Sequence, residues 1–169
     1  MIKENKKQNI LILHDIRSVH NVGAIFRTAD AAGISKIYLT GYTPAPLDRF
    51  GRKRGDMAKS ALGAEESVSW EQKVNITALL TKLKKEKFYI IAIEQDEKSV
   101  DYKKVSTKGG PAYGWKGGMA FIAGPEVEGL SQSILNKCDV IAEIPMLGKK
   151  ESLNVSVATG IALFRIIKI

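Results

Sequence analysis

Short apolar runs alternate with amphipathic segments along most of this chain. Five runs have the length and the β-branched composition of buried strands, at residues 10–16, 36–40, 89–93, 119–123 and 140–144. Segments with helical periodicity lie between most of them, at 22–32, 76–87, 131–136 and 155–167. Strands that alternate with helices predict an α/β fold, in which a mostly parallel sheet is flanked by helices.

Polar and glycine-containing segments follow three of the predicted strands. They lie at 17–23, 124–131 and 148–154. Ligands of open parallel sheets bind beyond the carboxyl ends of the strands. We therefore expect the functional residues of this protein to lie in these three segments.

The first segment leads into the helix at 22–32. Asn21 precedes this helix, where its side chain is expected to act as the N-cap, and Gly33 is the expected helix terminator. Arg27 lies in the second turn among apolar neighbours. A buried or half-buried arginine requires a carboxylate or a phosphate, so Arg27 either forms a structural ion pair or contacts the substrate.

The second segment, GPEVEGLS at 124–131, joins a strand to the start of a helix. Exposed backbone amides at such a position can hold a ligand. Glu126 is placed to accept a hydrogen bond from a ligand hydroxyl or to pair with Arg27. Glu128 is expected to face the solvent.

The third segment ends at Ser152-Leu153-Asn154 and leads into the last helix. Ser152 is expected to cap this helix, and Asn154 to add a second local hydrogen bond. The helix at 155–167 carries apolar side chains on nearly every side, which is typical of a buried helix. In a chain this short, part of that surface is expected to meet a second subunit, so we predict a homodimer.

Length and composition are those of an ordinary globular domain. The chain has 169 residues, which predicts a single domain over 1–169. Its one cysteine, Cys138, excludes an internal disulfide and suits a cytoplasmic protein. No apolar run approaches the about 20 residues of a membrane span, and no apolar segment of a signal peptide follows the charged N-terminus.

The net charge of +8 favours a polyanionic partner. Two stretches interleave basic and aromatic residues, a mixture that suits phosphate contact plus base stacking. In the first stretch, four basic residues flank Phe50: Arg49, Arg52, Lys53 and Arg54. The second stretch contains Tyr102, Lys103, Lys104, Lys108, Tyr113, Trp115 and Lys116.

Several common enzyme classes are excluded by motifs that the sequence lacks. There is no P-loop for a nucleoside triphosphate, and the glycines at 124–131 do not have the spacing of a dinucleotide-binding fingerprint. His14 and His20 have no partners at metal-ligand spacing, so we predict no metal site. No serine, histidine and acid stand in the order of a hydrolase triad.

Three segments resemble, in order and spacing, motifs 1, 2 and 3 of the SpoU (TrmH-type) RNA methyltransferases of the SPOUT superfamily. They are NVGAIFRTAD at 21–30, GPEVEGLS at 124–131 and IPMLGKKESLNVS at 144–156. The resemblance covers nearly the whole chain. It implies an α/β domain with a deep C-terminal trefoil knot, an obligate homodimer, and S-adenosylmethionine (SAM)-dependent transfer of a methyl group to a ribose 2′-oxygen of tRNA or rRNA.

The resemblance also implies roles for individual residues. In the family the loops of the knot hold SAM, largely through backbone groups, and the matching residues here are Ala123, Gly124, Ile144, Met146, Ser152 and Leu153. The matching catalytic residues are Asn21, Arg27, Glu126, Ser152 and Asn154. The family's arginine at the position of Arg27 is usually assigned to activation of the 2′-hydroxyl. Because a guanidinium is effectively never deprotonated, we favour Arg27 as a clamp on phosphate and ribose.

Larger family members carry an RNA-binding region before motif 1, whereas 20 residues precede that motif here. We therefore expect no N-terminal substrate-binding extension, and RNA contacts through Arg49, Arg52, Lys53, Arg54 and the stretch at 103–116. Two other functions are considered: an RNA-binding SPOUT protein without activity, and a SPOUT enzyme that methylates a base nitrogen. The matched catalytic residues argue against the first, and the signature at 152–154 favours the ribose over the base.

Overall fold

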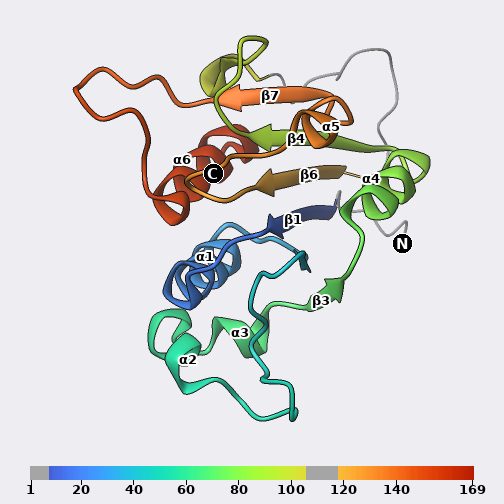
Figure 1. Cartoon of the computed structure of the whole chain (residues 1–169), viewed down its shortest axis with the longest axis vertical. Coiled ribbons are helices and arrows are strands. Elements are labelled where there is room, and N and C mark those ends of the chain that lie inside the picture. Colours follow the sequence, from blue (N-terminus) through green and yellow to red (C-terminus); the bar gives the residue numbers. More distant parts are fainter. Residues whose placement is uncertain (1–7, 106–117) are drawn as a thin grey trace, which may run out of the picture.

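The computed structural model describes residues 8–105 and 118–169. One seven-stranded sheet has the strand order β3-β2-β1-β6-β4-β7-β5 (Figure 1). Its strands are β1 (Gln8–His14), β2 (Lys36–Thr40), β3 (Trp70–Lys73), β4 (Phe88–Ile93), β5 (Val100–Asp101), β6 (Gly118–Ala123) and β7 (Val140–Glu143). Each pair of neighbouring strands is parallel, which confirms the predicted α/β class.

Helices cover both faces of the sheet. On one face lie α1 (Val19–Ala31) and α6 (Val155–Ile167), with α2 (Gly55–Ala61) and α3 (Ala64–Ser67) packed beside α1. On the other face lie α4 (Ile76–Lys85) and α5 (Gln132–Leu135). A short 3-10 helix, η1 (Tyr102–Lys104), follows β5 and contacts α6.

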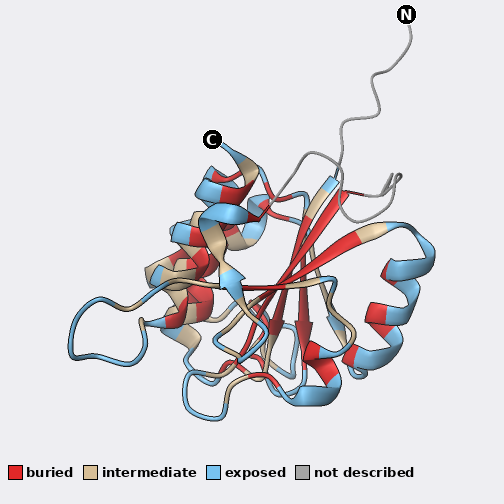
Figure 2. Ribbon diagram, turned by 90° about the horizontal axis from the view of Figure 1, so that it is seen from above, coloured by how far each residue is buried: buried red, intermediate tan, exposed pale blue. Residues whose placement is uncertain are grey.

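Alternate side chains of the strands build two cores, one on each face of the sheet. In β1, Leu11 and Leu13 belong to the core that contains Phe26 of α1, whereas Ile10 and Ile12 belong to the core that contains α4. Figure 2 shows that the buried residues concentrate in the strands and on the helix faces turned toward them. Since the strands are parallel, their carboxyl ends share one edge, and the loops that follow them meet there.

Helix α1 begins three residues earlier than predicted. Its N-cap is Ser18, whose Oγ accepts a hydrogen bond from the backbone nitrogen of Asn21 at 3.2 Å. The prediction that Asn21 caps this helix is therefore wrong. Asn21 lies inside the first turn, and its side chain is available for contacts elsewhere. The helix does end as predicted, with Gly33 at φ +67° after the last turn.

The capping of α6 also differs from the prediction. Asn154 is its N-cap, because Oδ1 of Asn154 accepts hydrogen bonds from the backbone nitrogen of Ser156 at 2.9 Å and from its hydroxyl at 2.6 Å. Ser152 therefore does not cap this helix. Nor is α6 buried on every side, since Val157, Ile161 and Phe164 are 48%, 37% and 38% exposed.

Helix α2 lies very close to α1. A Cβ atom at Gly23 would lie 2.8 Å from the carbonyl oxygen of Met57 and would also collide with the hydroxyl of Ser60. Only glycine permits this approach without a shift of backbone. Because α2 directly follows the loop at 41–54, the contact fixes that loop relative to α1.

Candidate active site

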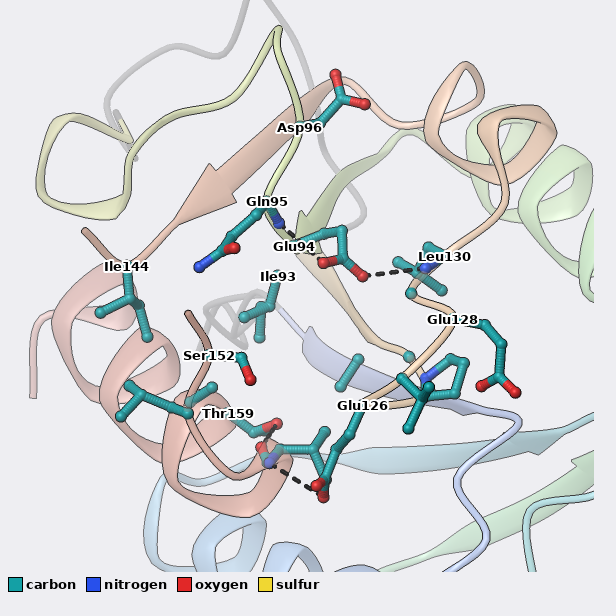
Figure 3. Close-up of a pocket in the computed structure, with 18 of the residues that line it drawn as sticks. Ile93, Glu94, Gln95, Asp96, Glu126, Glu128, Leu130, Ile144, Ser152 and Thr159 are labelled. Carbon is teal, nitrogen blue, oxygen red and sulfur yellow. Dashed lines mark hydrogen bonds between the residues drawn. The ribbon is translucent and has the colours of Figure 1, made fainter. Parts of the chain in front are cut away.

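Loops that follow β4, β6 and β7 surround one cavity of about 430 Å³, together with the first turns of α6 (Figure 3). The long loop at 144–154, which leaves β7 and returns to α6, forms one wall. The cavity is lined by every residue that the resemblance matches to the cofactor site: Ala123, Gly124, Ile144, Met146, Ser152 and Leu153.

The lining of this cavity is acidic although the chain is strongly basic. Five carboxylate residues line it: Glu94, Asp96, Glu126, Glu128 and Glu151. Among the described residues, no lysine or arginine does so. Much of the remaining wall is apolar, so the cavity suits a ligand with an apolar body and a positively charged centre.

Two lining residues that the sequence reasoning missed tie the loops together. Both carboxylate oxygens of Glu94 accept hydrogen bonds, one from the backbone nitrogen of Gln95 at 2.9 Å and one from that of Leu130 at 3.0 Å. The side-chain amide of Gln95 donates to the carbonyl oxygen of Glu151 at 2.9 Å. The loop after β4 therefore holds both other walls of the cavity. Because this loop directly follows the strand predicted at 89–93, the sequence could have indicated it as a further site loop.

A chain of hydrogen bonds connects the three motif segments. Nδ2 of Asn154 donates to Oδ1 of Asn21 at 3.2 Å, and Nδ2 of Asn21 donates to Oε1 of Glu126 at 2.7 Å. The same Glu126 oxygen accepts from the backbone nitrogen of Val155 at 3.4 Å. Asn21, Glu126 and Asn154, which are far apart in the sequence, are thus brought together as predicted from their loops.

A second cavity of about 220 Å³ shares a wall with the first. Residues 125–128 line both cavities, and Asn21 lines the second one with residues 15–18. Glu126 therefore stands between the two spaces. The rim carries a loose exposed ion pair, in which Arg17 lies 3.6 Å from Glu128 and donates to the hydroxyl of Tyr42 at 3.4 Å. The exposure of Glu128 agrees with the prediction.

Ser152 and Arg27 differ from the other candidates. Ser152 lies beside the first cavity, and its side chain has no hydrogen bond to any described residue. Arg27 is exposed, lines neither cavity and forms no ion pair within the described part of the chain. The expected burial of Arg27 is wrong, because its side chain is exposed. Of the two alternatives for Glu126, the pairing with Arg27 is not observed, and Glu126 instead accepts hydrogen bonds from Asn21 and Val155.

The first basic stretch forms the loop between β2 and α2. The guanidinium carbons of Arg49 and Arg52 lie 4.7 and 5.0 Å from the centre of the Phe50 ring. Lys53 pairs with Glu66 at 2.6 Å, and Arg54 pairs with Asp56 at 3.4 Å. These two basic side chains are therefore partly neutralised, whereas Arg49 has no acidic partner among the described residues.

The second basic stretch is described only in part. Lys103 lies 5.7 Å from the ring centre of Tyr102 in η1. Lys108, Tyr113, Trp115 and Lys116 lie outside the described residues.

The histidines take no part in a metal cluster within the described ranges. The Nδ1 atom of His14 lies 2.9 Å from Oγ1 of Thr40, and its Nε2 lies 3.2 Å from the carboxylate of Asp15. Burial lowers the pKa of His14, partly offset by Asp15. In the same described ranges, no helix is long and apolar enough to cross a membrane.

Comparison with known proteins identifies the family. The model of the SpoU rRNA Methylase family matches residues 8–164. The chain belongs to this family. The predicted resemblance is thereby confirmed, and the mostly parallel sheet is the SPOUT methyltransferase fold.

Several relatives are similar over nearly the whole chain. The 23S rRNA (guanosine-2'-O-)-methyltransferase RlmB of Escherichia coli K12 is 33% identical over 159 residues, 94% of this chain and 59% of the relative. RlmB of Ralstonia nicotianae is 34% identical, over 94% of this chain and 58% of the relative. The chain thus spans less than two thirds of the length of these relatives.

Solved structures agree with these relatives. An AdoMet-bound rRNA methyltransferase from Sinorhizobium meliloti superposes with a TM-score of 0.80 at 27% identity, over 94% of this chain and 55% of that one. The TrmH/SpoU tRNA modifying enzyme of A. aeolicus gives a TM-score of 0.79 at 28% identity, over 96% of this chain and 75% of that one.

Proposed function

We propose that this protein is a SAM-dependent RNA methyltransferase that transfers a methyl group to a ribose 2′-hydroxyl of rRNA or tRNA. The acidic cavity at the ends of β4, β6 and β7 carries this proposal. SAM has positive charges on its sulfonium and its amino group against one carboxylate, which leaves it a net cation, and it has a flat aromatic adenine. Five carboxylates and an apolar wall match that ligand, whereas an anionic cofactor would be repelled.

The residues proposed to hold SAM are those whose loops form the cavity. Gly124, Ile144 and Leu153 line the cavity and are proposed to bind SAM through backbone groups, as the family resemblance implies, while the carboxylates supply charge complementarity. When bound, SAM supplies an electrophilic methyl group. The chain itself has to orient the acceptor ribose and manage the proton of its weakly acidic hydroxyl.

Glu126 is proposed to position that ribose. Its Oε1 atom already accepts hydrogen bonds from Asn21 and Val155, whereas Oε2 has no partner among the described residues. A carboxylate between the two cavities can accept a hydrogen bond that the ribose 2′-hydroxyl donates. Asn21 and Asn154 fix the orientation of Glu126. Ser152, whose side chain has no hydrogen-bond partner among the described residues, is proposed to contact SAM directly.

Arg27 is proposed to bind phosphate and stabilise the developing alkoxide. Its guanidinium is exposed and has no ion-pair partner among the described residues, so it can meet RNA without breaking a described ion pair. RNA is also proposed to contact Arg49, Arg52, Lys53 and Arg54. The net charge of +8 favours RNA, whereas the acidic cavity favours the cationic SAM, so charge separates the two substrates.

The described part of the chain forms a single α/β unit, and we propose one catalytic domain over 1–169, with the trefoil knot of the family. A homodimer is supported by the exposed apolar side chains of Val157, Ile161 and Phe164 on α6. A cytoplasmic location is supported by the lone cysteine.

Calorimetry with SAM in the presence of a chelator tests the cofactor assignment. We expect binding without metal, and no binding at millimolar SAM would overturn the assignment. RNA from cells with and without the protein, compared by mass spectrometry, tests the reaction. Loss of one 2′-O-methyl nucleotide is expected. Loss of a base-methylated nucleotide would favour the base-nitrogen enzyme, and no change would favour an inactive RNA-binding protein.

A further inference from the structure

The aromatic ring of Phe50 is presented to the solvent between two positive charges. Phe50 is 65% exposed, and its ring belongs to neither of the two cores. The guanidinium groups of Arg49 and Arg52 lie within 4.7 and 5.0 Å of its centre. A single exposed apolar residue is common, but an exposed ring flanked by two guanidinium groups is a specific arrangement.

The turn that carries this ring is held rigidly by one carboxylate. Asp48 accepts hydrogen bonds from the backbone nitrogens of Phe50 at 2.8 Å and Arg52 at 3.0 Å, and from Nε of Arg52 at 2.9 Å. Backbone bonds between Asp48 and Arg52, and between Gly51 and Asp48, close the turn. The hydrogen bonds that the Asp48 carboxylate accepts, first from the backbone nitrogen of Arg52 and then from its side chain and from Phe50, lower the pKa of Asp48. The ring is therefore preorganised, and ligand binding need not order this turn.

The turn lies on the side of the protein where a substrate would approach. It follows β2, whose carboxyl end shares one sheet edge with the loops of the candidate active site. An antiparallel bridge between Leu47 and Lys53 closes its base. It leads into α2, which packs against α1 at Gly23, two residues from Asn21. The turn is thus anchored against α1, the helix that carries Asn21 and Arg27.

We propose that Phe50, with Arg49 and Arg52, forms a stacking platform for an unpaired base of the RNA substrate, an inference that rests on the proposed function. Both guanidinium groups lie over the ring, so a base would stack on the outer face of a guanidinium or take the place of one on the ring. Arg49 has no acidic partner among the described residues and can also bind a flanking phosphate, whereas Arg52 is paired with Asp48. An acidic protein surface would satisfy the charges but would not need the exposed ring. RNA supplies both phosphate charge and an aromatic partner.

Binding of short single-stranded RNA at low salt tests the platform, because stacking on an exposed ring tolerates any base. The probes are an oligoadenylate and a ribose-phosphate oligomer of the same length without bases. We expect Phe50→Ala to weaken oligoadenylate binding about tenfold, to leave the salt slope unchanged and to have little effect on the abasic oligomer. Phe50→Trp should restore binding. Arg49→Gln should instead reduce the salt slope by about one unit on both probes.

The matched control is Val74→Ala, because Val74 is 99% exposed and lies in the loop before α4, away from the turn. This variant should bind both probes as the wild type does. Failure of the wild type to prefer oligoadenylate over the abasic oligomer would overturn the platform. An equal loss on both probes for Phe50→Ala would also overturn it. A change in the oligomeric state of Phe50→Ala would overturn the platform as well, because it would show that the ring packs against a second copy of this chain.

SAM binding and methyl transfer of the same variants separate this inference from the proposed function. Phe50→Ala should bind SAM like the wild type, because Phe50 does not line the acidic cavity. If the wild type methylates RNA while Phe50→Ala keeps full oligoadenylate affinity, only the platform fails. If the base-dependent effect of Phe50 is present while no RNA is methylated, only the proposed function fails.

Discussion

The side-chain amide of Asn21 donates a 2.7 Å hydrogen bond to the carboxylate of Glu126, which lies 105 positions further along the chain. Because Asn21 also accepts from Asn154, its amide can point only one way. The three segments that resemble family motifs are therefore one hydrogen-bonded unit. That unit leaves one Glu126 oxygen without a described partner, at the wall between the two cavities.

Glu126→Gln should reduce methyl transfer strongly while the protein stays folded. The substitution removes the negative charge, and its new amide group would donate where the carboxylate accepts. Loss of one electrostatic contact in a transition state costs about 10²–10³ in rate. Single-turnover assays at saturating SAM measure the effect. Glu97→Gln is the control, since Glu97 is an exposed carboxylate that lines neither cavity. Equal rates for the two variants would contradict the role of Glu126.

Arg27→Ala should abolish methyl transfer with little change in SAM affinity or in thermal stability. Arg27 lines neither cavity, and it has no ion pair among the described residues whose loss would destabilise the fold. Calorimetry with SAM and a transfer assay measure the two properties separately. A variant that loses SAM affinity but still methylates at saturating SAM would show that Arg27 serves the cofactor rather than the ribose, and would contradict the proposed role.

The triple variant Arg52→Ala, Lys53→Ala and Arg54→Ala should show the opposite pattern. It should bind RNA more weakly and with a flatter salt dependence, by about one unit of log–log slope for each lost phosphate contact. All three residues already pair with an acidic side chain, Arg52 with Asp48, Lys53 with Glu66 and Arg54 with Asp56, so a reduction of fewer than three units is expected. An unchanged slope would remove this loop from the RNA-binding surface.

Gly23→Ala should destabilise the protein although alanine normally favours a helix by about 1 kcal/mol over glycine. The new Cβ would lie 2.8 Å from the carbonyl oxygen of Met57, so α2 would have to move. The matched control is Gly160→Ala in α6, where the nearest atom is Thr28 Cγ2 at 3.4 Å, an ordinary contact. Thermal unfolding should show a lower midpoint for Gly23→Ala and an unchanged or higher one for Gly160→Ala. The reverse order would refute the close packing of α1 and α2.

Apolar runs predicted β1, β2, β4, β6 and β7 because buried parallel strands read as continuous hydrophobic segments. The strand β3 was missed because it has no such apolar run. Its sequence is WEQK, and it lies at the edge of the sheet. There Glu71 forms an ion pair with Lys36 at 2.7 Å instead of packing in a core. Polar edge strands have no hydrophobic signal.

The candidate site was predictable as a set of loops but not as a set of contacts. Ser18 and Asn21 are both good capping residues, and the sequence alone does not say which one begins α1. The choice of Ser18 frees Asn21 to reach Glu126. Similarly, Glu94 gains its role only when the loop after β6 folds against it at Leu130. Such contacts depend on the tertiary arrangement of segments distant in sequence.

Cys138 should react very slowly with alkylating reagents in the folded protein. Burial, with a smaller contribution from Asp139, raises the pKa of its thiol to about 12, and Sγ donates to the carbonyl oxygen of Ile134 at 3.4 Å. Since the thiolate is the nucleophile, its fraction at pH 8 is about a thousandfold below that of a thiol with the ordinary pKa of 9.0. Mass spectrometry after iodoacetamide treatment should show labelling in denaturant and little without it. Equal labelling in both states would contradict this burial.

The exposed face of α6 should mediate dimer formation. Val157, Ile161 and Phe164 are partly exposed on a helix whose other residues are mostly apolar, and such a surface is costly for a monomer to leave in water. Sedimentation at micromolar concentration should give twice the 18.5 kDa of one chain. Phe164→Asp should shift the protein toward the monomer, because dimerisation would bury an unpaired charge. Val74→Asp, on a surface loop before α4, should remain dimeric. A wild-type monomer, or equal dissociation of both variants, would contradict an interface on α6.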